Sequence, residues 1–146
     1  MKAVLDTNIL VSAFLYGGVP LDVLRLADAG VIDVVTSEDA LSELATVLAR
    51  PKFRDRLRQL GFSARTAVRR YRELASVVEV SDRPGICEDP ADDEFIAIAI
   101  ASEADIIVSG DRHLLDRADR SPIPVVTAAE LVVALRELRD SLDDPQ

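Results

Sequence analysis

The chain has 146 residues, of which 49% are hydrophobic and 29% charged, and its formal net charge is −9 at pH 7. This length suits one folded domain, and the composition excludes a disordered or fibrous chain. A single cysteine, Cys87, excludes an intrachain disulfide and fits a reducing compartment, so we expect a cytoplasmic protein. No apolar stretch approaches the roughly 20 residues of a membrane-spanning helix, and no membrane partner is expected.

Short apolar segments alternate with helical patterns along the chain. The predicted strands are residues 2–6, 31–35, 77–80, 105–109 and 124–126. The predicted helices are 9–16, 21–29, one after Thr36 or Ser37, one from Phe53 to Leu60, one after Ser63, one from Asp93, a turn at 112–117 and one after Thr127. This alternation predicts an α/β fold with a mostly parallel five-stranded sheet and helices on both faces. We expect one domain over residues 1–142 and a frayed tail over 143–146.

Two helix caps and one leucine stripe follow from the same patterns. Thr7-Asn8 is expected to cap the first helix, and Asp92 to cap the helix that begins at Asp93. The leucines of the last helix fall on one side, at Leu131, Leu135, Leu138 and Leu142. This stripe and the apolar faces of the short helices leave more apolar surface than one small sheet covers. Together with the family resemblance given below, this surface favours a homodimer.

Acidic residues stand at the ends of the predicted strands and at the start of the buried helix. Asp6 ends the first strand, Asp93 lies in the first turn of the helix before the fourth strand, and Asp111 follows that strand. Ligands of open parallel sheets bind at the carboxyl ends of the strands, so these acids converge if strands one and four are neighbours. Glu43, in the helix after the second strand, is close enough in sequence to join the same rim. For the five acids at 88–94 alone, a solvated acidic loop is the simpler interpretation.

A cluster of carboxylates needs a counter-charge. Two carboxylates at ~5 Å and an effective dielectric of ~20 repel by roughly 3 kcal/mol before screening. Protons or a divalent cation relieve this repulsion, and oxygen-only ligands favour Mg²⁺ or Mn²⁺. A metal held in this way binds phosphate oxygens and activates water.

The basic residues are concentrated in one segment. Residues 50–72 carry nine basic side chains and one acid, Asp55, whereas the rest of the chain is strongly acidic. Arg65, Arg69 and Arg72 fall on one outward stripe of the predicted helix. Such a segment suits contact with nucleic-acid phosphates. A solvated surface paired with acids elsewhere is the alternative.

These motifs together resemble a known family. Asp6-Thr-Asn8 after the first strand, Glu43, Asp-Pro-Ala-Asp-Asp93-Glu-Phe-Ile-Ala, and Ala-Asp-Ile-Ile-Val-Ser-Gly-Asp111 are similar to the PIN domain. More narrowly, the chain resembles the PIN-family toxins of bacterial toxin–antitoxin pairs, which are related to VapC. The resemblance covers nearly the whole chain.

The resemblance implies a metal-dependent endoribonuclease that hydrolyses RNA phosphodiesters with Mg²⁺ or Mn²⁺ and leaves a 5′-phosphate. It implies catalytic roles for Asp6, Glu43, Asp93 and Asp111. Asp6, Asp93 and Asp111 would hold the metal, and Asn8 and Ser12 would orient Asp6 or bound water. Arg65, Arg69 and Arg72 are expected to bind RNA. His113 stands where the family often has an acid. A cognate antitoxin is the implied partner.

Other activities remain as alternatives or are excluded. The first alternative is a non-catalytic PIN-like module for RNA binding or regulation, and the second is a metal-dependent phosphatase of small esters. The first strand is followed by neither Gly-x-Gly-x-x-Gly nor a Walker lysine loop. His113 is the only histidine, which leaves too few ligands for a His/Cys zinc site. Cys87 is expected to pack, and Glu94 to lie at the surface.

Overall fold

The computed structural model describes residues 1–81, 90–110 and 121–144, with the side chains of residues 90–92 left out. The strands are β1 (Lys2–Leu5), β2 (Asp33–Thr36), β3 (Ser76–Val77), β4 (Ile106–Val108) and β5 (Val125–Val126). The helices are α1 (Thr7–Tyr16), α2 (Gly18–Asp28), α3 (Glu38–Leu48), η1 (Pro51–Phe53), α4 (Arg54–Leu60), α5 (Ala64–Leu74), α6 (Pro90–Ser102) and α8 (Ala128–Asp143). The turn expected at 112–117 lies outside the described residues.

The described strands form one five-stranded sheet in the order β3-β2-β1-β4-β5, and every paired neighbour is parallel. β1 is the central strand, with Val4 opposite Val35 of β2 and Ile107 of β4. The predicted α/β class, the five parallel strands and the helices on both faces are therefore confirmed. β5 is an edge strand. Pro124 lies directly before it, where the missing backbone N–H of proline costs the sheet no hydrogen bond.

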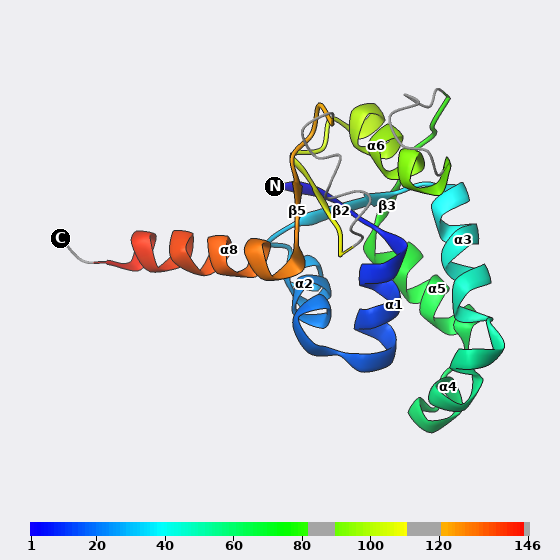
Figure 1. Cartoon of the computed structure of the whole chain (residues 1–146). Coiled ribbons are helices and arrows are strands. Elements are labelled where there is room, and N and C mark those ends of the chain that lie inside the picture. The colour runs from blue at the N-terminus through cyan, green and yellow to red at the C-terminus, as the bar shows by residue number, and fades with distance from the viewer. Residues whose placement is uncertain (82–89, 111–120, 145–146) are drawn as a thin grey trace.

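Alternation along the strands produces two hydrophobic cores. Leu5, Val34 and Val108 point to one face and pack with α1, α2, α3, α5 and α8. Val4, Val35 and Ile107 point to the other face and pack with α6. Figure 1 shows α6 on one side of the sheet and α1, α2 and α5 on the other. Both faces of the central strands are covered, so consecutive residues such as Val4 and Leu5, or Ile107 and Val108, are both apolar and buried.

Two helix starts differ from the sequence prediction. α1 begins at Thr7, and its cap is Asp6, whose side chain accepts a hydrogen bond from the backbone N–H of Ile9. Thr7 and Asn8 are therefore helical residues. α6 begins at Pro90, because proline fits the first turn of a helix, so Asp92 does not precede the helix as a cap.

Several other bounds moved by a few residues. α2 starts at Gly18 instead of Leu21, directly after α1. β2 begins two residues later than expected, and β3 is reduced to Ser76–Val77 because only these residues pair with β2. The last helix runs to Asp143, one residue beyond the expected domain end.

No single helix among the described residues is long and apolar enough to cross a bilayer. α1 and α2 pass the length and composition test as a pair, but they meet at an angle of 100°. Their buried residues belong to the hydrophobic core on the α1 side of the sheet, which accounts for their apolar composition.

The two sides of α6 allow a matched test of core packing. Ile98 is fully buried against the sheet, whereas Ile100 is 46% exposed. Replacing Ile98 by alanine leaves a cavity and should lower the free energy of unfolding by about 2–5 kcal/mol. Ile100→Ala should change it by less than about 1 kcal/mol, because the side chain is already hydrated. Urea denaturation of both variants measures the difference, and equal losses would contradict this placement of α6.

Candidate active site

Asp6 stands at the carboxyl end of the central strand. The chain continues from β1 to β2 on one side, while β4 pairs on the other, so Asp6 lies at the topological switch point where ligands of such sheets bind. The side chain is 3% exposed. Its Oδ1 accepts a hydrogen bond of 2.8 Å from the backbone N–H of Ile9, and its Oδ2 accepts one from the Ser109 hydroxyl. The carboxylate is therefore fixed from both sides, by α1 and by the residue after β4.

Glu43 lies one turn and a half into α3 and is half-buried. Its Oε2 accepts a hydrogen bond of 2.9 Å from the Thr7 hydroxyl, and Thr7 itself is 5% exposed. Because Thr7 directly follows Asp6, this bond sets Glu43 next to the residue at the end of β1. The expectation that Glu43 lies near the rim that carries Asp6 agrees with this contact.

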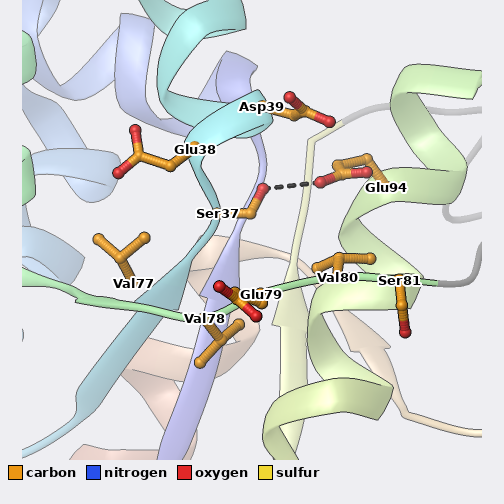
Figure 2. A pocket seen from close by; sticks show the side chains of 9 residues that line it. All are labelled: Ser37, Glu38, Asp39, Val77, Val78, Glu79, Val80, Ser81 and Glu94. Atoms are coloured by element: carbon orange, nitrogen blue, oxygen red, sulfur yellow. Dashed lines mark hydrogen bonds between the residues drawn. The ribbon is translucent and has the colours of Figure 1, made fainter.

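Asp93 is 4% exposed in the first part of α6. The next residue, Glu94, is also 4% exposed, so its expected position at the surface was wrong. Glu94 Oε1 accepts a hydrogen bond of 2.7 Å from the Ser37 hydroxyl (Figure 2). The same hydroxyl accepts from the backbone N–H of Ala40 at 3.1 Å and so caps α3. One serine thus connects the helix of Asp93 to the helix of Glu43.

Tyr71 is a buried residue whose hydroxyl is influenced by the charge of Asp6. It comes from α5 and is 1% exposed. Burial raises the pKa of its hydroxyl above the usual range, the negative charge of Asp6 raises it further, and nearby Thr36 partly opposes the rise. The Tyr71 hydroxyl therefore stays protonated at neutral pH and adds no charge near Asp6.

The other predicted site residues either make no contact with Asp6 among the hydrogen bonds of the described residues or lie outside those residues. Asn8 is exposed and Ser12 half-buried on α1, and neither side chain makes a hydrogen bond to another described residue. Asp6 is oriented by Ile9 and Ser109 instead. Asp111, His113 and Cys87 lie outside the described residues.

An acidic pocket of about 710 Å³ lies beside Glu94, between the start of α3 and the segment after β3 (Figure 2). Glu38, Asp39 and Glu79 bring their carboxylates to its wall. Arg72 of α5 forms a two-pronged ion pair with Glu38, at 2.6 and 2.7 Å. This pair lowers the pKa of Glu38 and raises that of Arg72.

Of the three arginines predicted to bind RNA, one already forms an ion pair within the protein. Arg65 and Arg69 are exposed on α5, as expected. Arg72 is exposed too, but Glu38 already occupies its guanidinium. A phosphate would have to compete with that carboxylate.

The described residues fit a hard divalent cation by the chemistry of their donors. Asp6 and Asp93 offer buried carboxylate oxygens, and each carboxylate oxygen retains a lone pair when it accepts one hydrogen bond. Within the described part of the chain, no group of three His, Cys, Asp or Glu side chains is placed to hold a metal ion. The third predicted ligand, Asp111, lies beyond that part.

Comparison with known proteins assigns the chain to a family. A family model described as "PIN domain" matches residues 2–113. The chain therefore belongs to the PIN-domain family, whose members are generally nucleases. The uncharacterized protein MJ1680 of Methanocaldococcus jannaschii is 29% identical over 124 residues, which are 83% of this chain and 77% of that protein.

A solved structure shares the fold. It is a chain of VapBC2 from Rickettsia felis, crystallised bound to a DNA fragment from the promoter. The TM-score is 0.59 at 17% sequence identity, over 86% of this chain and 97% of that chain. At this identity the likeness concerns the fold.

Sequence reasoning missed the side-chain contacts of four polar residues around the acids: Thr7, Ser37, Glu94 and Ser109. Thr7 and Ser37 were considered only at helix starts, and their contacts with Glu43 and Glu94 carried no signal because these partners are distant in sequence. Ser109 directly precedes Gly110 at the end of a predicted strand, which is a position at the rim of the sheet. That position was the one signal available for it.

Two capping serines allow a test of the Ser37–Glu94 bond. Ser37→Ala removes a helix cap and one hydrogen bond from a buried carboxyl group, so the free energy of unfolding should fall by roughly 2–4 kcal/mol. Ser63→Ala removes only an exposed cap of α5 and should cost about 1 kcal/mol. Thermal melts of both variants at neutral pH provide the comparison. Equal losses would mean that the bond to Glu94 contributes little.

Proposed function

We propose that this chain is a metal-dependent endoribonuclease and the toxin of a type II toxin–antitoxin pair. One observation carries the proposal: the buried Asp6 carboxylate is fixed at the switch point of a PIN-domain sheet. Burying a carboxylate is costly unless something binds it. Asp93 adds a second buried carboxylate in the helix that covers β1.

The residues divide into three roles. Asp6, Asp93 and Asp111 would hold Mg²⁺ or Mn²⁺, and Glu43 would orient the attacking water and accept its proton. Bound metal supplies an activated water and neutralises charge on the RNA phosphate. Ser109 and the Ile9 N–H keep Asp6 in one rotamer, and Thr7 does the same for Glu43. Asn8, in the first turn of α1, and Ser12, about one turn further along the same helix, would orient water.

RNA approaches over the basic helices. Arg65 and Arg69 are exposed and contact phosphates, and Arg72 adds a contact when it leaves Glu38. A polymeric substrate suits this stripe better than a small phosphate ester does, which disfavours the phosphatase alternative.

A cognate antitoxin restrains the nuclease. The similar fold of a chain in VapBC2, whose name denotes a toxin–antitoxin pair, supports such a partner. We further propose that the chain works in the cytoplasm as a homodimer, as its single cysteine and its leucine stripe suggest. The alternative is a non-catalytic PIN-like module that binds RNA or regulates without cleaving it. Cleavage assays separate the two functions.

Asp93→Asn tests the metal site. Asparagine keeps the shape but removes one charge and one strong ligand, so without metal the variant should be at least as stable as the parent. With Mn²⁺ at 100 times its dissociation constant, the parent should gain about 2.7 kcal/mol by mass action, and the variant much less. RNA cleavage should fall to background. Thermal melts in EDTA and in Mn²⁺, with cleavage of a fluorescent RNA, provide the measurements.

Asp33→Asn is the matched control, because Asp33 is exposed at the opposite, amino end of β2. It should retain both the Mn²⁺ response and cleavage. If Asp93→Asn cleaves RNA at the parent's rate, Asp93 has no catalytic role. If the parent binds RNA but never cleaves it, the non-catalytic alternative holds.

Alanine variants of the stripe test RNA binding. Arg65→Ala and Arg69→Ala should each weaken binding regardless of sequence and reduce the slope of log affinity against log salt by about 0.7. Arg72→Ala should have a smaller effect, because Glu38 holds that side chain. Fluorescence anisotropy with a catalytically inactive background measures the slopes. Unchanged slopes for Arg65 and Arg69 would remove α5 from the RNA surface.

A further inference from the structure

The last helix extends beyond the body of the protein. Figure 1 shows α8 starting beside α2 and running outward, away from α1 and α3. Leu131 is buried and Leu135 packs against the core, whereas Leu138 is 56% and Leu142 77% exposed. The leucine stripe is therefore covered by its own chain in the first half of α8 and uncovered in the second half.

The stripe has the spacing of a coiled-coil seam. Its leucines follow one another at intervals of four, three and four residues, from Leu131 to Leu142. These intervals are those of a heptad repeat with apolar a and d positions. In a single copy only the second half of this seam, Leu138 and Leu142, is left in water, and these two side chains fit a second helix better than they fit solvent.

A groove accompanies the exposed half of the stripe. It has a volume of about 550 Å³ and runs between α2 and α8. Leu26 and Val31 line one side, and Leu135, Leu138 and Leu142 line the other. Val31 is 48% exposed, although it is apolar. The groove and the ridge of leucines thus belong to one continuous apolar surface.

The charges around this surface are complementary to each other. Arg25 and Arg136 stand at the rim of the groove, and Arg25 is 73% exposed despite its contact with Asp22. The free end of α8 carries Asp143 and Asp144, where the helix dipole adds partial negative charge. The acidic free end of one copy is therefore opposite in charge to the basic rim of the groove of another.

We propose that α8 pairs antiparallel with α8 of a second copy of this chain. Leu138 lies at the two-fold axis and packs against Leu138 of the partner subunit. Leu142 packs beside Leu135 of the partner subunit and enters its groove near Val31. Asp143 and Asp144 then lie beside the partner subunit's Arg25. A two-fold interface uses the same patch on both copies, and this patch carries both halves of the match.

This inference deepens the homodimer of the proposed function and is independent of the catalytic assignment. The sheet edge that carries Asp6 is formed by the ends of the central strands, whereas the free end of α8 projects away from them (Figure 1). Association and cleavage can therefore be measured separately on the same variants.

Two substitutions at positions of similar exposure test the seam. Leu138→Asp places a charge at the two-fold axis and should raise the dimer dissociation constant at least about a hundredfold. Val133→Asp is the control, because Val133 is 51% exposed on another side of the same helix. Sedimentation equilibrium should show a dimeric parent, a dimeric Val133→Asp and a monomeric Leu138→Asp. Thermal melts at a concentration where all are monomeric should be similar.

Single cysteines test the antiparallel register in a Cys87→Ser background. Leu138→Cys should form a disulfide between copies under mild oxidation, and Leu142→Cys should not, because its neighbour is Leu135 of the partner subunit. A mixture of Leu135→Cys and Leu142→Cys chains should cross-link. A parallel pair would instead cross-link at both 138 and 142 in the single variants.

A charge exchange tests the rim. Arg25→Glu should weaken association about tenfold, and adding Asp143→Lys and Asp144→Lys should restore it. A monomeric parent, or a dimer that survives Leu138→Asp, would overturn the proposal. A monomeric parent that gains mass only with an added amphipathic helix would assign the groove to a different protein. If the unaltered protein forms the dimer but does not cleave RNA, the result contradicts the proposed function and leaves this dimer intact.

Discussion

The buried Asp6 carboxylate is the constraint on which the site depends. A charged group in the interior is tolerated only when it is hydrogen-bonded. Asp6 meets this requirement through the start of α1, which supplies the Ile9 N–H and a favourable dipole, and through Ser109 after β4. Ser109 is 103 residues away in sequence. The carboxylate is therefore held only when β4 pairs with β1, which makes the central strand order a condition for the site.

Two further hydrogen bonds extend this arrangement outward. Thr7 joins α1 to Glu43 of α3, and Ser37 joins the start of α3 to Glu94 of α6. Each bond connects two rigid elements. The first involves Glu43 itself and Thr7, the residue after Asp6, and the second involves Glu94, the residue after Asp93. Helices and strands position side chains more accurately than loops do. Asp6 and Glu43 are thus oriented by neighbours that take no part in the proposed chemistry themselves.

Sequence reasoning predicted what depends on local patterns and missed what depends on distant partners. The strands and helices followed from apolar runs and periodicity, and Asp6 followed from its place after the first strand. The cap of α1 was assigned to Thr7-Asn8 because both residue types are good caps, whereas Asp6, one position earlier, takes that role. Glu94 was expected at the surface because glutamate usually lies there. Its partner Ser37 is 57 residues away, and no local rule reveals that contact.

The distribution of charge, more than its sum, decides what this surface attracts. A net charge of −9 would repel RNA if it acted uniformly. At physiological salt the Debye length is about 8 Å, so a phosphate near α5 is influenced mainly by the exposed arginines around it. The Arg72–Glu38 ion pair lies at the border between this basic surface and the acidic pocket lined by Asp39 and Glu79. In this pair the positive charge of one stripe arginine and the negative charge of one pocket carboxylate neutralise each other. A phosphate that approaches along α5 therefore passes a neutral pair before it reaches the repulsive acids of the pocket.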